Sequence, residues 1–311
     1  MNEKLEQELI EKVKKNPLSL KYIKNPTEAV SLEAVKQDGY MLKYVKNQTE
    51  DICLAAVKNF GRSLEYVRDQ SKNVCLEAVK QDGLSLQFVR HEHLTKDVCL
   101  IAIRQNPNAL RYIKDQSEEI CLEAVRINGI TLCYVEDQNK ELCLEAVKQN
   151  GYALQDIKNK TDRVCLEAVK QNGSTLKYVD NQTYEICLEA IKQNPSSLKY
   201  VNDQTEEICL EAVRLDGNAL RYVKHQTDKI CLEALNNNVE CASLVNIDRR
   251  SIALILLKCC IQHNVKDKKI LNDIINKFND DEFKNIYTKH KLWKYVDFSK
   301  LKMLNKYFMT L

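Results

Sequence analysis

Apolar and polar positions along the chain repeat every 22 residues. In each copy, a segment close to "ICLEAVKQ" spaces its apolar residues in the way that one broad face of a helix does. A Thr or Ser precedes most copies, where its hydroxyl can accept a hydrogen bond from a first-turn amide. The acidic residues that follow suit the helix dipole. The pattern therefore predicts a helix of about ten residues in every repeat.

A cysteine sets the register of the repeats. Successive cysteines lie 22 residues apart, except for one step of 24, where two extra residues lie in the segment His91–Leu94. Degenerate copies with Leu9 and Ser31 at this position precede the first cysteine, which gives about ten repeats. The cysteines in this register are Cys53, Cys75, Cys99, Cys121, Cys143, Cys165, Cys187, Cys209 and Cys231.

A second column of the repeat marks where each helix ends. It holds all seven glycines and three of the four prolines: Gly39, Gly61, Gly83, Gly129, Gly151, Gly173, Gly217, Pro17, Pro107 and Pro195. Proline cannot adopt the left-handed conformation of a glycine cap. We therefore expect the preceding Asn or Asp to end the helix and the Gly or Pro to begin a second, short helix, either α or 3₁₀.

One such repeat cannot bury its own apolar surface. A ten-residue helix is marginal in isolation, and its apolar residues cover most of its circumference, so it needs neighbours on both sides. The sequence thus predicts an all-α solenoid over residues 1–247, stabilised by contacts between successive repeats. We expect the Tyr column to lie in the core, with its hydroxyl reaching the surface. The Gln column before each cap is expected to bond backbone groups of neighbouring repeats.

The period ends after Ile247. Residues 248–311 carry 14 Lys and Arg against 7 Asp and Glu, and basic and aromatic residues alternate near the end. We expect a helical capping segment that covers the last repeat, with nucleic-acid binding as the alternative for its basic face.

The tandem string that begins at Leu144, "LEAVKQNGYALQDIKNKT", resembles the repeat family called domain of unknown function 4116, frequent in giant viruses and some protists. This resemblance covers most of residues 9–247 and implies a helical repeat without a known activity. The element Ala190–Pro195 is similar to leucine-rich-variant repeats, which alternate α and 3₁₀ helices. Proteins of that second kind can carry an iron–sulfur module, and the clustered cysteines that it requires do not occur here.

No chemical site emerges from the spacing of reactive residues. Equivalent positions in stacked helices lie roughly 8–10 Å apart, too far for disulfides or one zinc ion, so the cysteine column is expected in the core and Cys133 as an exposed thiol. The five histidines are scattered, and His91 and His93 fall in an expected loop. The Glu column, with a basic residue three positions on, is expected to form solvated ion pairs. We predict no catalytic, metal or cofactor site, and hence a protein that is not an enzyme.

Two columns are candidates for binding. The position after Gly or Pro varies freely, either because a partner is recognised there or because nothing constrains it. Its members are Tyr40, Arg62, Leu84, Asn108, Ile130, Tyr152, Ser174, Ser196 and Asn218. Basic pairs three residues apart flank Tyr-Val and are expected to form a basic ridge, which Glu136, Asp180 and Asn202 interrupt. Its members are Lys21, Lys24, Lys43, Lys46, Arg111, Lys114, Arg221 and Lys224.

The function predicted from these features is a scaffold for protein–protein interaction. The alternative is a solenoid that binds RNA or DNA through the basic ridge and the C-terminal segment. No stretch has the length of a membrane span, and the first residues lack a signal-peptide core, so an intracellular protein with reduced cysteines is expected, in the cytoplasm or a viral factory. The sequence leaves the partner, the pathway and the oligomeric state open.

Overall fold

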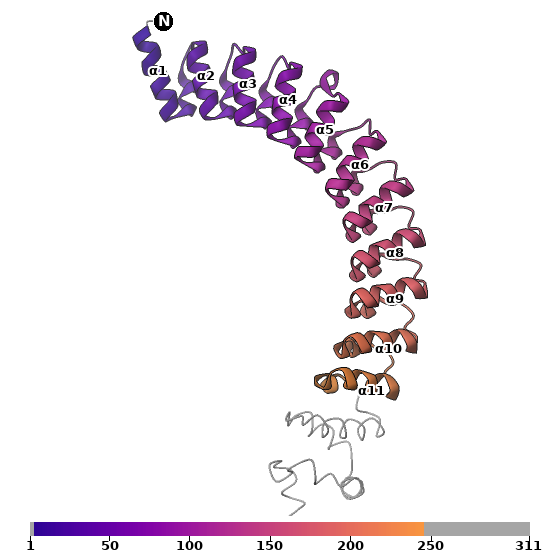
Figure 1. Ribbon diagram of the computed structural model, residues 1–311. Helices are drawn as coiled ribbons and strands as arrows, with labels where there is room; N and C mark the ends of the chain where they lie inside the picture. The colour runs from indigo at the N-terminus through magenta and orange to yellow at the C-terminus, as the bar shows by residue number, and fades with distance from the viewer. Residues whose placement is uncertain (1–2, 246–311) are drawn as a thin grey trace, which may run out of the picture. The chain divides into compact units, whose positions relative to one another are not determined.

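The computed structural model describes residues 3–245, which are helical throughout and contain no strand (Figure 1). The expected capping segment, residues 248–311, lies outside the described residues. The chain divides into two compact units, Met1–Lys160 and Thr161–Leu311. Each described part alternates α-helices with 3₁₀ helices, as an α-solenoid does.

The first unit contains α1 (Glu3–Lys15), η1 (Pro17–Tyr22), α2 (Glu28–Gln37), η2 (Gly39–Tyr44), α3 (Glu50–Asn59), η3 (Gly61–Tyr66), α4 (Lys72–Gln81), η4 (Gly83–Phe88), η5 (His91–His93), α5 (Lys96–Gln105), η6 (Pro107–Tyr112), α6 (Glu118–Ile127), η7 (Gly129–Tyr134), α7 (Lys140–Gln149) and η8 (Gly151–Asp156). The described part of the second unit contains α8 (Asp162–Gln171), η9 (Gly173–Tyr178), α9 (Tyr184–Gln193), η10 (Pro195–Tyr200), α10 (Glu206–Leu215), η11 (Gly217–Tyr222), α11 (Asp228–Asn237) and η12 (Val239–Leu244).

The predicted helix boundaries are confirmed. Thr27 caps α2 by accepting a hydrogen bond from the Val30 N–H at 3.4 Å, and the equivalent Thr and Ser residues do the same. Asn139 takes this role in α7, where its Oδ1 lies 2.9 Å from the Leu142 nitrogen. Because each cap supplies an acceptor to an otherwise unpaired amide, every ten-residue helix starts at a defined residue.

The second element of each repeat is a 3₁₀ helix, which settles the choice between α and 3₁₀. It begins at the Gly or Pro, as expected, and usually runs for six residues. The Asn or Asp before it is extended and accepts a hydrogen bond from the N–H two residues on; Asp38 Oδ1 lies 2.9 Å from the Tyr40 nitrogen. Phe60 stands in this position before η3 and provides no side-chain cap.

Within each unit the repeats stack in chain order (Figure 1). Every α-helix contacts the α-helices of the adjacent repeats of its unit, and the 3₁₀ helices form a second row beside them. The core lies between the two rows, where residues such as Ala56, Val57 and Leu64 have no exposed surface. The short helices are therefore stable only as a stack, because their apolar faces are covered by adjacent repeats.

The Gln column bonds adjacent repeats together, as predicted. The Gln48 amide donates from Nε2 to the Tyr66 carbonyl at 2.9 Å and accepts from the Arg68 N–H at 2.9 Å. The same pair of hydrogen bonds recurs at Gln70, Gln116, Gln138, Gln182 and Gln204. Because one side chain satisfies two backbone groups of the next repeat, this column fixes how successive 3₁₀ helices are spaced.

The cysteine column packs in the core, as predicted. Cys53 and Cys121 are each 3% exposed, and their equivalents are likewise buried free thiols. Burial raises the pKa of Cys53 and of Cys209 to about 11. The cysteines therefore act as small apolar residues.

The Tyr column, expected in the core with its hydroxyl at the surface, is less buried than that in the described residues. Tyr22 is 75% exposed, and Tyr44 and Tyr66 are half-buried. The buried places on the 3₁₀ helix belong to Leu42 and Val45, which are three residues apart and so lie on one face of a helix with three residues per turn. The tyrosine between them is turned towards the surface.

Candidate binding surface

The variable column lies on the surface of the 3₁₀ row, as the second residue of each 3₁₀ helix. Tyr40 and Tyr152 are each 38% exposed, and Arg62 is also exposed. Each backbone N–H of this column that follows an Asn or Asp cap bonds that cap, so the backbone is held whatever side chain is present. The remaining members are half-buried: Leu84, Asn108, Ile130, Ser174, Ser196 and Asn218.

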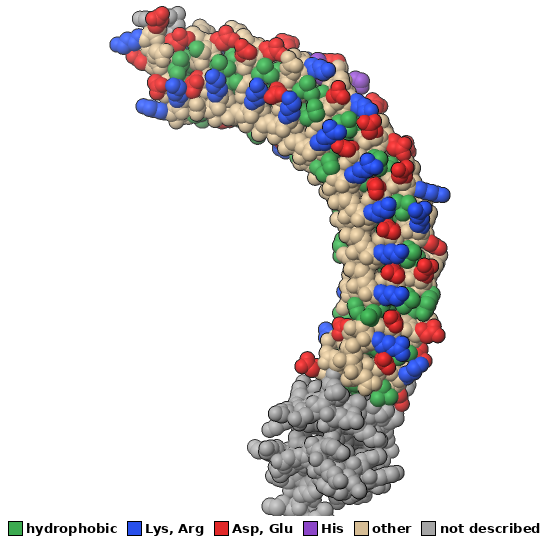
Figure 2. Space-filling view, in the orientation of Figure 1, with side chains coloured by type: hydrophobic (Ala, Val, Ile, Leu, Met, Phe, Trp, Pro, Cys, Tyr) green, Lys and Arg blue, Asp and Glu red, His purple; other side chains and the backbone are tan. Residues whose placement is uncertain are grey.

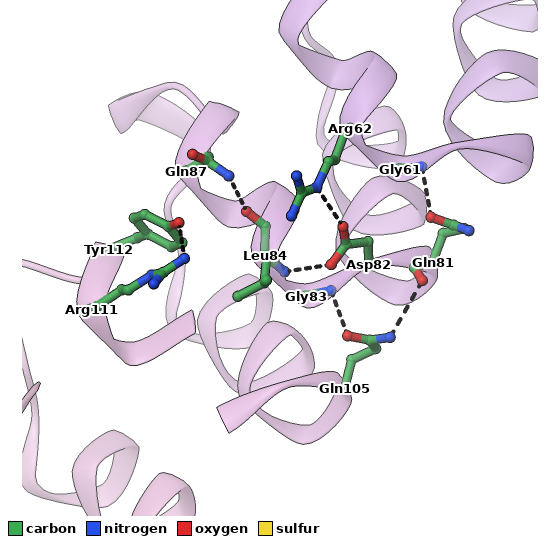
Figure 3. Close-up of polar contacts among 10 residues, drawn as sticks. All are labelled: Gly61, Arg62, Gln81, Asp82, Gly83, Leu84, Gln87, Gln105, Arg111 and Tyr112. Carbon is green, nitrogen blue, oxygen red and sulfur yellow. Dashed lines mark hydrogen bonds and ion pairs between the residues drawn. The ribbon is translucent and has the colours of Figure 1, made fainter. Parts of the chain in front are cut away.

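Arg62 is tied to the next repeat. Its Nε lies 3.0 Å from Oδ2 of Asp82, the residue that also caps η4 through the Leu84 N–H (Figure 3). The Arg62 side chain is 46% exposed, so this pair is a surface contact of small energy. Its effect is to orient the Arg62 side chain along the row.

The structure brings the variable column, the basic ridge and the Tyr column together near the start of the first unit. The rings of Tyr40 and Tyr66 meet edge to face, with centroids 5.3 Å apart. The Lys43 ammonium lies 3.9 Å from the centroid of Tyr40 and 4.8 Å from that of Tyr44. Lys43 lowers the pKa of Tyr40, whereas a hydrogen bond with Tyr40 raises the pKa of Tyr66 to about 12.

The first members of the basic pairs lie over tyrosine rings. Lys21 lies 5.7 Å from the centroid of Tyr22, and Arg111 lies 4.7 Å from that of Tyr112. Lys177 and Lys199 make the same contact in the second unit, with their own neighbouring tyrosines. In Arg221 the Nε donates instead to the Asn218 carbonyl at 3.3 Å. Cation–π contacts thus order most of these side chains along the edge.

The second members of the pairs take different partners. Lys24, Lys46, Lys114 and Lys224 are all exposed. The Lys224 ammonium reaches back to the preceding repeat and donates to the Asn202 carbonyl at 2.8 Å. The first members of the pairs therefore lie mostly over tyrosine rings, whereas among the second members Lys224 bonds a backbone carbonyl.

The α-helical row carries ion pairs. The expected pairing with the basic residue three positions on occurs between Glu77 and Lys80, whose Oε1 and Nζ lie 2.7 Å apart. Other pairs cross between repeats. Arg104 Nε lies 2.7 Å from Glu123 Oε1, and Arg214 Nε lies 3.0 Å from Glu233 Oε1, each pair joining adjacent repeats. Figure 2 shows basic and acidic side chains alternating over the helices. Their mutual pairing leaves this face less suited to a charged partner than the 3₁₀ edge.

Reactive side chains are dispersed in the described part of the chain. Cys133 is the exposed thiol that the sequence predicts, and His91 and His93 belong to the single 3₁₀ turn η5 instead of a plain loop. Within residues 3–245, His, Cys, Asp and Glu form no group of three that could hold a metal ion. Over the same residues, no helix combines the length and the apolar character needed to cross a membrane.

Comparison with known families gives five successive matches. The model of the family described as "Domain of unknown function (DUF4116)" matches residues 30–70, 71–116, 117–161, 163–205 and 183–226. These ranges cover most of the described helices, and each spans roughly two of the 22-residue repeats. Comparison with curated proteins and with solved structures gives no match.

Proposed function

This chain belongs to the DUF4116 family of helical repeats, and we propose that it is a non-enzymatic scaffold that binds a protein partner along its 3₁₀ edge. One observation carries the proposal. Tyr22, Tyr40, Tyr44 and Tyr66 stand at the surface of successive repeats, with Lys21 and Lys43 against their rings.

Such a cluster has the composition of a protein-binding surface. Tyrosine and arginine are enriched among the residues that dominate binding energy, since a rigid ring buries a large area at little entropic cost. Exposed apolar surface grouped in one place is typical of an interaction site. Repeat arrays present extended surfaces of this kind, and the side chains that vary along this edge provide the means of selecting a partner.

The alternative, a solenoid that binds nucleic acid, has less support. Cations of the second column, such as Lys224, already donate to backbone carbonyls, and Glu65 and Cys133 stand where basic residues would continue the first column. A run of free positive charges, which phosphate binding requires, is therefore interrupted. We also propose that the protein is intracellular, because its buried thiols stay reduced there.

Affinity capture from the source cell tests the proposal. Wild-type chain is compared with the double variant Tyr22→Ala/Tyr44→Ala and with a variant of the variable column, Tyr40→Ala/Arg62→Ala/Tyr152→Ala. Tyr184→Ala is the matched control, because Tyr184 is 52% exposed but belongs to the first turn of α9. Each capture is run both with and without nuclease.

The expected result is a set of proteins retained by wild type and by Tyr184→Ala and lost by the tyrosine double variant. Capture that needs intact nucleic acid and falls steeply with salt would favour the alternative instead. Identical captured proteins for all variants would remove the 3₁₀ edge from consideration.

A further inference from the structure

A cavity of about 450 Å³ opens on the first unit between the repeats of α6 and α7. Its apolar lining comes from Cys121, Val135 and Leu142, all of them buried. The amides of Gln116 and Gln138, which bond adjacent repeats, also line it. The walls are thus held in place by the same bonds that build the stack.

The cavity lies at a position where other repeats have a contact between a basic side chain and a backbone carbonyl. In several repeats, the residue after the "Tyr-Val" pair is basic and reaches back across the junction. Arg68 Nη1 donates to the Lys46 carbonyl at 2.7 Å, and Lys158 Nζ donates to the Glu136 carbonyl at 2.8 Å. Arg90 makes the same bond to the Arg68 carbonyl.

Glu136 occupies this position in the repeat of α6 and η7. A carboxylate cannot donate to the equivalent acceptor, the Lys114 carbonyl, and both residues line the cavity. The Lys114 carbonyl accepts one bond from the Gln116 N–H at 3.1 Å and has a second lone pair. Among the described residues, no side chain donates to it. The cavity therefore lies where a basic side chain lies in other repeats.

The charges around the cavity favour a cation. Glu118, Glu136 and Asp137 line it together with one ammonium group, that of Lys114. Glu118 is engaged by Asn139, whose Nδ2 lies 2.6 Å from its Oε1. In residues 3–245, the carboxylates of Glu136 and Asp137 have neither a hydrogen bond nor an ion pair. The Lys158 ammonium is bound at the Glu136 carbonyl and does not line the cavity.

A comparable cavity in the second unit has the opposite charge. It measures about 490 Å³ and also lies at a junction where a basic residue is replaced, here by Asn202. Three lysines line it, Lys177, Lys199 and Lys224, against the single carboxylate of Asp180. Both cavities thus lie where the basic residue is replaced, by Glu136 in one and by Asn202 in the other, but only the one in the first unit suits a positive group.

We propose that the cavity beside Glu136 receives a Lys or Arg side chain of a partner protein. The cationic group donates to the Lys114 carbonyl and pairs with Glu136 and Asp137, while its aliphatic stem packs on Val135 and Leu142. The partner thereby supplies the contact that Arg68 and Lys158 make within the chain. This inference rests on the proposed function, since it assigns a chemical feature to the protein that is bound.

Nuclear magnetic resonance titration of the full chain tests the assignment. The probes are two blocked peptides, acetyl-Gly-Gly-Arg-Gly-Gly-amide and its citrulline counterpart, which has the same shape without the charge. The arginine peptide is expected to shift the amide signals of Gln116, Glu136 and Asp137, and the citrulline peptide to bind at least tenfold more weakly.

Glu136→Lys is the decisive variant. The introduced lysine is expected to fill the cavity by donating to the Lys114 carbonyl, as Lys158 does to the Glu136 carbonyl, so the fold is retained and peptide binding falls at least tenfold. Glu207→Lys makes the same change of charge on α10 and is expected to leave binding unchanged.

Two outcomes overturn the inference: equal binding of the two peptides, or undiminished binding to Glu136→Lys. The variant Tyr22→Ala/Tyr44→Ala separates this result from the proposed function. It is expected to lose captured proteins while still binding the arginine peptide, so a failure of either idea is seen independently of the other.

Discussion

The Gly61 N–H donates a 2.6 Å hydrogen bond to Oε1 of Gln81, the last residue of the next α-helix (Figure 3). Asn or Gln accepts in the same way from Gly39, Gly83, Gly129, Gly173 and Gly217. Pro107 and Pro195 have no N–H, and the residues in the accepting position of the next repeat are Ile127 and Leu215. Across each of these junctions, a Gly therefore faces an amide acceptor, and a Pro faces an apolar residue.

Replacing Gln81 by Ala is expected to destabilise the stack. The change leaves the buried Gly61 N–H without its acceptor, which costs about 1–3 kcal/mol. Hydrogen exchange of the Gly61 amide is the direct measurement, and its protection should fall by a corresponding factor in Gln81→Ala.

Gln37→Ala provides the matched control. Gln37 occupies the same position, but the preceding repeat has Pro17, and the Gln37 amide bonds only Glu33 on its own helix, at 2.9 Å. We expect a loss below about 0.5 kcal/mol, typical of a surface change. Equal losses for Gln37→Ala and Gln81→Ala would show that the amide stabilises its own helix and not the junction.

The matching also predicts an interaction between two substitutions. Gly61→Pro alone should be costly, because a Cβ at Gly61 would lie 2.6 Å from the Ala78 carbonyl oxygen and because Gln81 loses its donor. Phe60 is already extended, with φ −144° and ψ 101°, as a residue before proline must be. Adding Gln81→Ile restores the pair that occurs at Pro107 and Ile127.

The double variant is thus expected to lose less stability than the two single variants combined, by about 0.5–3 kcal/mol. Urea unfolding of the four proteins, followed by circular dichroism, measures this difference. Strictly additive losses would mean that the pairing of Pro with Ile or Leu is coincidental.

Local structure is predictable from this sequence because its signals are local. Thr27 caps its helix and Asp38 ends it through bonds to residues two or three positions away, so boundaries can be assigned without knowledge of the neighbouring repeats. The repeat of apolar positions likewise predicts stacking, because a helix with apolar residues on most of its circumference needs neighbours on both sides.

Contacts that cross a junction are predicted only in part: the bonds of the Gln column follow from the sequence, whereas the pairing of Tyr40 with Tyr66 does not. Tyr40 meets Tyr66, which lies one repeat step and four further residues along the chain, a relation visible only once the stack is known. The sequence marks Glu136 as an interruption of a basic ridge; the structure adds that residues at the equivalent position, such as Arg68 and Lys158, donate to a carbonyl, which a carboxylate cannot do. One relation between repeats is visible in the sequence: Gln81 follows a repeat with Gly61, whereas Ile127 follows a repeat with Pro107. Finding it requires comparing adjacent repeats instead of single columns.

The pair Tyr40 and Tyr66 predicts a separation of tyrosine titrations. The hydrogen bond from Tyr66 to Tyr40 raises the pKa of Tyr66 to about 12, above its ordinary value of 10. Between pH 10 and 12 the unfolded chain loses this proton while the folded chain keeps it. The stabilising effect of this group is therefore complete below pH 10 and is lost as the pH rises to 12.

Tyrosine-labelled nuclear magnetic resonance can follow this titration. Tyr40→Phe removes the acceptor, so the pKa of Tyr66 should return towards 10. Tyr152→Phe, at the equivalent position of η8, should leave it unchanged. Lys43→Ala should raise the pKa of Tyr40, because Lys43 favours its phenolate through a hydrogen bond and its charge. An unchanged Tyr66 titration in Tyr40→Phe would show that the two hydroxyls are not bonded in solution.

Thiol labelling should distinguish Cys133 from the cysteine column. Cys133 is exposed on η7, whereas Cys53 and Cys75 are buried and burial raises the pKa of each to about 11. Because the thiolate is the reacting species, labelling of the buried thiols at pH 8 must await local opening of the stack. Iodoacetamide treatment followed by peptide mapping should find Cys133 modified at least tenfold faster than Cys53. In Gln48→Ala, which removes the bonds to the Tyr66 carbonyl and the Arg68 N–H, labelling of Cys53 should accelerate while that of Cys133 stays the same. Equal rates for Cys53 and Cys133 in the wild-type chain would contradict the packed core described for α3.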